Sequence, residues 1–421
     1  MNPFKILKKK KLDGNYVLAL DIGTAFIKAL IFRIDREAGK GYVEGVGRQE
    51  QTWGHMQAGA VTDIAGVVRS CQQAIQQAVA RARIKPTQAI IGIAGELVKG
   101  TTTTVRYERL KPKTKINLAE LRNILHKVQW KAFDRVRRQL AWETGYNEID
   151  VKLINAAIVD VKIDGYHISN PIGFQGKDVT ITIFNSYAPL VHLGAVQTIA
   201  EELDLDLLSI AAEPYAVARS VAGDGAEEFS AIFIDVGGGT TDVAVVRKGG
   251  IEGTKMFALG GRAFTKRLAE VLGQNLPKAE EVKLQYSNGR LRRDRIFKVR
   301  QALEQDSKIW LAGVELTLGE FSSNSDLLPG RILLCGGGSL LPEIKAVLLS
   351  EAWISKLPFG RLPDVSYLKP DDVVNIIDLT ASLVDPSDVT PMALANLALE
   401  LAGEEGMIGG IMRKVVRMIQ T

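Results

Sequence analysis

Two cysteines are all that this sequence of 421 residues contains, and they stand far apart as Cys71 and Cys335. Without a Cys-x-x-Cys pair or a His/Cys cluster, the sequence gives no disulfide framework and no structural zinc site, which suits a reducing cytoplasm. We expect both cysteines to be small core residues. No apolar run approaches the roughly 18–20 residues that cross a bilayer, and no signal-peptide core follows the first lysines. Any membrane contact should therefore be peripheral.

Two common nucleotide-binding motifs are also absent. No GxxxxGK[ST] occurs, which argues against a P-loop NTPase, and no glycine turn has GxGxxG spacing between a strand and a helix, which argues against a dinucleotide-binding domain. The formal net charge of +5 is mild, so nucleic acid is not the expected partner, whereas a membrane surface stays open. The length suits two lobes built from several subdomains.

What the sequence does contain is three glycine turns, each following an apolar strand. In residues 232–246 an apolar run ends at Asp235, a glycine turn follows, and a second apolar run returns, which predicts a hairpin. Bare glycine N–H groups can approach a phosphate, and a carboxylate at the strand end can hold Mg²⁺ or its waters. Taken alone, an ordinary glycine-turned hairpin explains the stretch equally well. The turn consists of Gly237, Gly238, Gly239 and Thr240.

A second copy of this design favours the phosphate interpretation. Residues 18–24 repeat the order of apolar strand, aspartate, apolar residue, glycine and hydroxyl, so that Asp21 aligns with Asp235 and Gly23 with Gly237. A duplicated hairpin predicts two similar domains that face each other across one phosphate chain. The third turn, residues 336–338, follows another apolar strand and precedes a predicted helix over 340–349. Such a turn can pass under a sugar or purine ring.

These turns resemble the two phosphate motifs and the adenosine motif of the actin, sugar-kinase and heat-shock-chaperone ATPase superfamily. Within it, the chain most resembles the FtsA family of actin-like cell-division proteins, on residues 59–63 (GAVTD), 170–176 (NPIGFQG), 213–216 (EPYA) and 279–283 (AEEVK), and on an amphipathic C-terminus. The opening residues 4–8 (FKILK) are closer to PilM, the pilus-assembly relative. The resemblance implies an α/β actin-like ATPase fold, with two lobes of duplicated mixed-sheet domains and an inserted SHS2-like α/β subdomain.

The resemblance also implies a site for ATP and Mg²⁺ between the lobes. Asp21 and Asp235 would organise the ion, and Glu213 would orient the attacking water, so that Glu213 and Asp235 are the expected catalytic residues; a Glu213 that only caps its own helix is the alternative. Slow turnover is expected, because no second base is evident. The phosphates would meet Gly23, Thr24, Lys28, Gly237, Gly238, Gly239 and Thr240. The ribose and purine would meet Gly260, Gly261, Glu280, Lys283, Gly336, Gly337 and Gly338, unless Glu280 and Lys283 are only a solvent-exposed ion pair.

The predicted domains follow from these motifs and from helix and strand patterns. A helix over residues 63–83 should begin at Thr62 as its N-cap, and residues 117–142 form a basic helix of the insertion, a candidate surface for self-assembly. The boundaries are a basic tail (1–13), lobe 1 (14–85 and 167–210), the insertion (86–166), lobe 2 (211–385, with a smaller subdomain at 262–328), a helix returning to lobe 1 (386–402), and a short linker with a C-terminal helix (403–421).

The C-terminal helix favours FtsA over PilM and over a sugar kinase, for which no sugar-binding constellation is found. Its apolar face and its cationic face predict binding in the plane of an anionic lipid surface, on the cytoplasmic side of the cell membrane. By resemblance, the partners are the division-ring protein FtsZ and further copies of the chain in filaments, with a PilM-like pilus scaffold as the alternative. The predicted membrane residues are Ile408, Ile411, Met412, Arg413, Lys414, Val415, Arg417, Met418 and Ile419.

Overall fold

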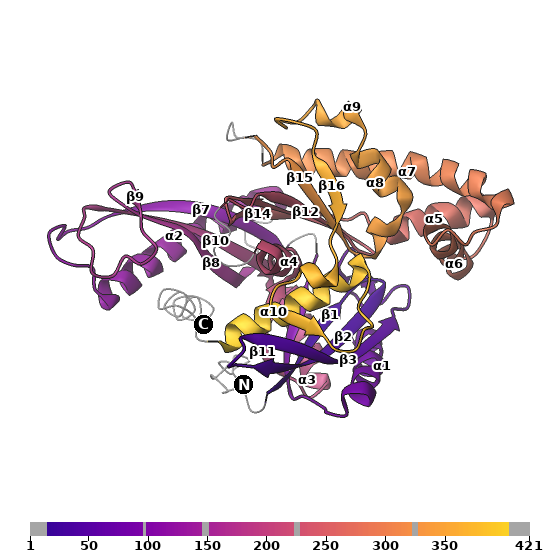
Figure 1. The fold of residues 1–421 in the computed structure, drawn as a ribbon, viewed down its shortest axis with the longest axis horizontal. Coiled ribbons are helices and arrows are strands. Elements are labelled where there is room, and N and C mark those ends of the chain that lie inside the picture. The colour runs from indigo at the N-terminus through magenta and orange to yellow at the C-terminus, as the bar shows by residue number, and fades with distance from the viewer. Residues whose placement is uncertain (1–14, 96–97, 145–150, 223–227, 322–326, 404–421) are drawn as a thin grey trace.

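The computed structural model describes residues 15–95, 98–144, 151–222, 228–321 and 327–403, with side chains throughout except in 139–144 and at 222. Within these ranges the chain forms two lobes and one insertion (Figure 1). No helix of the described part is long and apolar enough to span a membrane. The basic tail over 1–13 and the predicted membrane helix, with all nine of its named residues from Ile408 to Ile419, lie outside the described residues.

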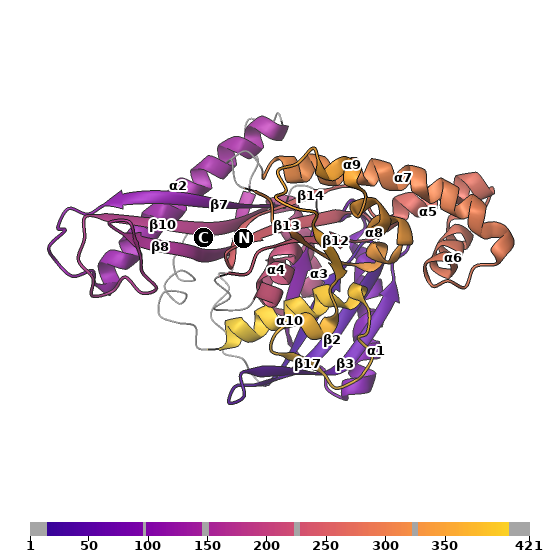
Figure 2. The same cartoon turned by 45° about the horizontal axis from the view of Figure 1, so that its top comes forward.

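Lobe 1 is built on a sheet of six strands in the order β11-β6-β1-β2-β3-β17. Helix α1 packs on β2 and β3, and α10 packs on β1 and β2 from the other face (Figures 1 and 2). Asp63 caps α1 by accepting a hydrogen bond from the N–H of Gly66, so the predicted cap Thr62 is wrong by one residue. The elements are β1 (Tyr16–Ile22), β2 (Phe26–Asp35), β3 (Lys40–Glu50), β4 (Met56–Gln57), β5 (Ala60–Val61), α1 (Ile64–Ala82), β6 (Gln88–Ile93), α3 (Leu190–Glu202), β11 (Asp206–Ala212), α4 (Glu213–Ala222), β17 (Ile376–Asp378) and α10 (Val389–Ala402).

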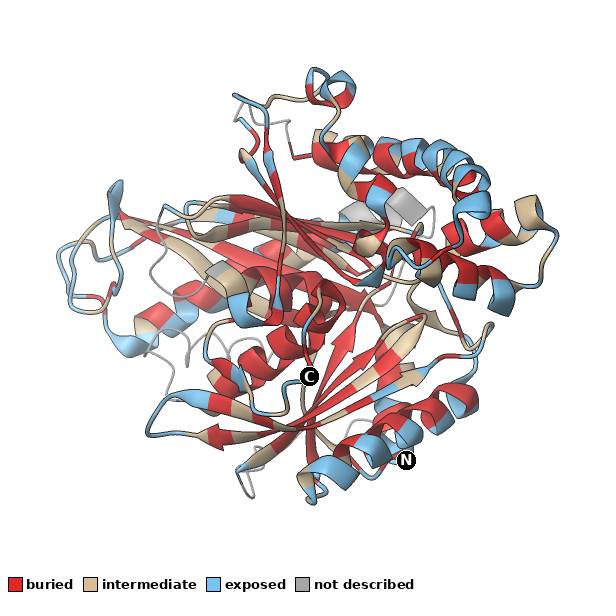
Figure 3. Cartoon of the chain, turned by 45° about the vertical axis from the view of Figure 1, so that its right-hand side comes forward, coloured by how far each residue is buried: buried red, intermediate tan, exposed pale blue. Residues whose placement is uncertain are grey.

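Lobe 2 begins with the second copy of the glycine hairpin. Along β12, Ile232, Ile234 and Val236 belong to the core of lobe 2, and the alternate residues Ala231 and Phe233 belong to the core that includes α4. This alternation buries both faces of the strand, as Figure 3 shows along the middle of both lobes. The elements are β12 (Ala231–Val236), β13 (Thr241–Arg247), β14 (Gly250–Phe257), α5 (Gly261–Leu272), α6 (Leu276–Ser287), α7 (Arg293–Gly319), β15 (Arg331–Cys335), η1 (Gly337–Leu340), α8 (Pro342–Leu348), α9 (Glu351–Ile354), β16 (Asp364–Tyr367), η2 (Pro370–Asp372) and η3 (Pro386–Asp388).

The insertion continues the sheet of lobe 2 instead of forming a separate layer. In the described residues this sheet has nine strands, in the order β16-β15-β12-β13-β14-β7-β10-β8-β9 (Figure 2). The link between β14 and β7 is only two residue pairs long, Gly253 with Thr101 and Thr254 with Gly100. A Cβ on Gly100 would lie 2.1 Å from the hydroxyl of Thr254, so glycine permits this close pairing. The insertion elements are β7 (Lys99–Glu108), α2 (Leu118–Thr144), β8 (Val151–Ile163), β9 (Tyr166–His167) and β10 (Asp178–Pro189).

The strand pairing moves both predicted boundaries of the insertion. We placed its start at residue 86, but β6 lies inside the lobe 1 sheet, next to β1. We placed its end at residue 166, but β10 pairs along its whole length with β8 and β7. The insertion therefore runs from β7 through β10, and its buried side chains form a core of their own beneath α2.

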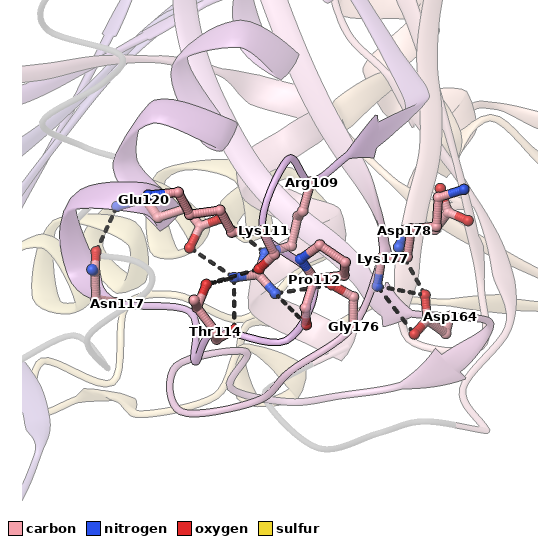
Figure 4. Close-up of polar contacts among 10 residues, drawn as sticks. All are labelled: Arg109, Lys111, Pro112, Thr114, Asn117, Glu120, Asp164, Gly176, Lys177 and Asp178. Carbon is pink, nitrogen blue, oxygen red and sulfur yellow. Dashed lines mark hydrogen bonds and ion pairs between the residues drawn. The ribbon is translucent and has the colours of Figure 1, made fainter.

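A buried arginine fixes the far end of the insertion (Figure 4). The side chain of Arg109 is fully buried and donates to both carboxylate oxygens of Glu120, at 2.8 and 2.9 Å. It also donates to the carbonyls of Thr114 and Gly176, both at 2.9 Å. Because every contact of this guanidinium is to a loop or to the start of α2, Arg109 ties the segments 109–117 and 170–176 together, the second of which carries the NPIGFQG motif.

Candidate nucleotide site

The two glycine hairpins have the same register and face each other across the lobes. In β1–β2, Asp21 pairs with Lys28, and in β12–β13, Asp235 pairs with Asp242. The turns touch: a Cβ on Gly238 would lie 2.6 Å from the Cβ of Ala25, and one on Gly239 would lie 2.8 Å from the hydroxyl of Thr24. The structure therefore brings Gly23, Thr24 and residues 237–240 together, as the duplication predicted.

Carboxylates gather behind these turns. Glu213 opens α4, and its side chain lies against Gly92 at the end of β6; the Oε1 atom has no hydrogen-bond partner, so this atom does not cap the helix. Burial, followed by the charges of Asp21, Asp242 and Asp235, raises the pKa of Glu213 well above its usual range. Burial and then Asp235 likewise raise the pKa of Asp242 well above its usual range. Burial raises the pKa of Asp235 as well, against the opposing hydrogen bond from Thr390.

The half-buried side chain of Lys28 balances part of this negative charge. The ammonium of Lys28 lies 3.2 Å from Oδ2 of Asp21 and donates to the carbonyl of Ser387. Burial acts to lower the pKa of Lys28, but Asp21 together with Asp235 and Asp388 outweighs it, and the pKa is raised. In this structure Lys28 thus pairs with carboxylates and backbone.

Three site residues were missed by sequence reasoning. Asp242 stood inside the glycine motif without an assigned role, although the alignment of the two copies places it at the position equivalent to Lys28. Thr390 donates from its hydroxyl to Oδ2 of Asp235 at 2.6 Å, and Ser387 receives Lys28. Both come from η3 and the start of α10, more than 150 residues after Asp235 in the chain. The alignment of the two glycine hairpins could have identified Asp242, but nothing in the sequence pointed to Ser387 or Thr390.

The predicted ribose and purine residues also come together. The N–H of Gly261 donates to the carbonyl of Gly237 at 2.8 Å, which seats the start of α5 on the second turn. The ammonium of Lys283 lies 2.8 Å from Oε2 of Glu280 and donates to the carbonyl of Gly261 at 2.9 Å. Because Lys283 is buried, the alternative of a solvent-exposed ion pair is wrong. Burial, opposed by Glu280, lowers its pKa.

The third glycine turn, residues 336–338, packs against the end of β12 at the same site. Gly336 has φ +79°, and a Cβ there would lie 2.1 Å from Oδ1 of Asp235. A Cβ on Gly338 would lie 2.6 Å from Cγ1 of Val236. Glycine is therefore needed at Gly336 for the backbone conformation and at both positions for the close approach to β12. Cys335, next to the turn, is buried like Cys71, as expected for core residues.

The residues present fit a phosphate chain with a cation, with one restriction. One carboxylate oxygen of Glu213 and one of Asp242 have no hydrogen-bond partner, and the pKa values of both groups are raised. The cluster therefore has more carboxylates than cationic or hydrogen-bonding partners, and a bound cation would balance them. No group of three or more His, Cys, Asp or Glu side chains in the described residues is placed to bind a metal directly, so the donor set suits an ion that keeps its waters. The cavity bordered by Ala25, Gly238, Arg262 and Lys283 measures about 20 Å³. Ligand pockets usually measure about 300–1,000 Å³, so this cavity is narrow, and the lobes must part for a nucleotide to enter or leave.

Comparisons with known proteins agree with this architecture. A family model described as cell division protein FtsA matches residues 232–362. The chain is 28% identical over 275 residues to the cell division protein FtsA of Neisseria meningitidis serogroup B, covering 64% of this chain and 61% of that protein, which is less than two thirds of its length. It is 23% identical over 425 residues to the FtsA of Streptococcus pneumoniae serotype 2, covering 96% and 89%. A solved structure titled PilM-PilN type IV pilus biogenesis complex has a TM-score of 0.62 at 16% identity, covering 91% of this chain and 98% of that chain.

The facing hairpins, the sheet order and the structural likeness define an actin-like ATPase fold, as the motifs predicted. In sequence, the chain is related to the bacterial cell division protein FtsA, which confirms the resemblance that its motifs carry.

Proposed function

We propose that this chain is an ATP-binding, actin-like protein of bacterial cell division. On this proposal it forms filaments on the cytoplasmic face of the cell membrane and holds the FtsZ division ring there. The observation that carries the nucleotide site is the pair of facing hairpins, whose Asp21 and Asp235 lie with Lys28 beneath two touching glycine turns. The assignment to division rests on the relatives named FtsA.

The chain's own residues suit a nucleotide that acts mainly as a conformational ligand. The turns present backbone N–H groups from both lobes, so one phosphate chain bound between them would favour the closed arrangement by its differential affinity for that state. Bound Mg²⁺ would supply charge neutralisation, with Asp21 and Asp235 holding its waters. Glu213 is the carboxylate placed to orient a water near the phosphates. We infer that hydrolysis is slow and that assembly depends on ATP binding.

The nucleotide site is tested by calorimetric titration of the full-length chain with Mg·ATP. Asp21→Ala and Asp235→Ala should each lower the affinity at least about tenfold, because each removes a carboxylate from the proposed ion site. Asp371→Ala, at an exposed position in η2, is the matched control and should bind as wild type does. Unchanged affinity in both site variants would show that the site is elsewhere.

A PilM-like pilus scaffold is the second candidate, and the TM-score of 0.62 to the PilM–PilN structure favours it. Co-sedimentation of the chain with an FtsZ C-terminal peptide, beside a PilN N-terminal peptide, separates the two. The membrane proposal rests on the sequence pattern of residues 407–420 and is tested by flotation with anionic vesicles. A chain ending at Gly403 and the variant Ile411→Glu should float poorly, and if either floats as wild type does, this helix is not the anchor.

A further inference from the structure

A continuous series of contacts joins the two glycine turns through Arg262. This arginine is the second residue of α5, and its backbone N–H donates to the carbonyl of Gly238 at 2.7 Å. Its guanidinium crosses to lobe 1, where Nη2 donates to the carbonyl of Gln51 at 2.9 Å. The backbone N–H of Gln51 in turn donates to the carbonyl of Ala25 at 2.8 Å. The path therefore runs from the lobe 1 turn through Gln51 and Arg262 to the lobe 2 turn.

These contacts are shielded from water. Gln51 is 1% exposed. The guanidinium carbon of Arg262 lies 4.5 Å from the centre of the Trp53 ring, so the indole covers one face of the cation. Burial lowers the pKa of Arg262, opposed by Glu280 and Glu50. A charge-assisted hydrogen bond and a cation–π contact both gain strength in such a partly desolvated place.

The position of this bridge matters because the turns already touch. Because Gly238 and Ala25 are in contact, a phosphate chain can enter or leave the space between the lobes only while the turns separate. Gln51 is held by its N–H to the first turn, and Arg262 is held by its N–H to the second. Separating the turns therefore pulls the guanidinium away from the carbonyl of Gln51 and from the ring of Trp53.

We propose that Arg262, with Gln51 and Trp53, is a latch that holds the lobes closed and sets the rate at which a nucleoside triphosphate enters and leaves. This inference rests on the proposed nucleotide site and goes beyond it, since it assigns control of exchange to a positioning residue that none of the three motifs requires. Lys283 cannot take this part, because its ammonium is already bound to Gly261 and Glu280 within lobe 2.

The first test measures binding and release of a fluorescent ATP analogue by stopped flow, with the full-length chain. In Arg262→Ala, association and dissociation should both become about tenfold faster, because a charged hydrogen bond and a cation–π contact are lost. The dissociation constant should change less than about threefold, since both rates move together. Trp53→Leu should give a smaller acceleration. Arg267→Ala is the control, because Arg267 lies on the same helix but pairs with Asp306 and Glu270.

The second test needs no nucleotide. Amide hydrogen exchange in peptides covering residues 47–56 should be about tenfold faster in Arg262→Ala than in wild type or Arg267→Ala, since loss of the guanidinium uncovers Gln51, which is 1% exposed in the closed arrangement. Exchange and nucleotide dissociation at wild-type rates in Arg262→Ala would overturn the latch. If wild type binds no nucleotide at all, the proposed function fails, and the exchange rates alone decide whether the lobes are latched. If Arg267→Ala accelerated exchange and dissociation as much as Arg262→Ala does, the latch would also be overturned, because both effects would then come from a general loss of stability.

Discussion

Replacing Glu213 by glutamine should stabilise the nucleotide-free protein at neutral pH. Burial and then the charges of Asp21, Asp242 and Asp235 raise the pKa of Glu213 well above its usual range. Its Oε1 atom has no hydrogen-bond partner, so an amide can replace the carboxyl group without losing a bond at this atom. The substitution keeps the size of the side chain and removes only its ability to ionise.

The direction with pH follows from proton binding. Between the unfolded pKa of about 4.3 and the raised folded pKa, the folded protein holds a proton that the unfolded chain has released, so its stability falls as pH rises through this window. A pKa that differs by one between the folded and unfolded states corresponds to about 1.4 kcal/mol, and a buried group without a partner costs about 1–3 kcal/mol. We expect Glu213→Gln to gain about 1–2 kcal/mol at pH 7.5 on this scale and to gain nothing below pH about 4.

The assay is urea unfolding of wild type and Glu213→Gln at several pH values between about 4 and 8. Glu37→Gln, at an exposed turn after β2, is the control and should change the free energy of unfolding by less than about 0.5 kcal/mol. A Glu213→Gln protein that is less stable than wild type at pH 7.5, or whose difference from wild type does not vary with pH, would refute the reasoning.

Two further substitutions test the contacts between and within the lobes. Gly238→Ala places a Cβ 2.6 Å from that of Ala25 and should cost about 1–3 kcal/mol in urea unfolding, whereas Gly194→Ala, with open space around it in α3, should cost nothing; equal effects would contradict the turn contact. Arg109→Met leaves Glu120 without its buried partner and should lower the free energy of unfolding by about 3–5 kcal/mol. Arg106→Met, at the exposed pair with Asp178, is the control and should cost less than about 1 kcal/mol. A similarly small effect at Arg109 would show that its contacts are not needed to hold the segments 109–117 and 170–176 together.

What the sequence could predict was local. The two hairpins were predicted with their aspartates at equivalent positions, because an apolar strand, a glycine turn and a returning strand form within about fifteen residues. The helix at Glu213 and the pair of Glu280 and Lys283 on one face of α6 follow from equally short patterns. The alternative of a solvent-exposed ion pair failed because burial depends on tertiary packing, which cannot be inferred from the spacing of two residues in the sequence.

What the sequence could not predict was long-range. The return of residues 386–402 to lobe 1 was predicted, but the contacts of Ser387 with Lys28 and of Thr390 with Asp235, which depend on how α10 packs on β1, were not. The boundaries of the insertion depended on strand pairing, and the link between β14 and β7 is made by two residue pairs without a sequence signature. Gln51, Trp53 and Arg262 lie in a loop and a helix start that carry no family motif, so only their contacts reveal them.

The duplicated hairpins have diverged at one position that matters for charge. Lys28 in the first copy corresponds to Asp242 in the second, so one copy supplies the cation and the other adds a carboxylate. Lys28→Met should therefore destabilise the chain by about 3–5 kcal/mol at pH 8, because the buried Asp21 loses its partner. As pH falls, the carboxylates with raised pKa values take up protons and need the cation less, so the cost should shrink toward pH 5. Urea unfolding at both pH values measures this, with Lys40→Met at the exposed start of β3 as the control. A cost for Lys28→Met that is the same at pH 5 and pH 8 would mean that packing, and not charge, holds this lysine in place.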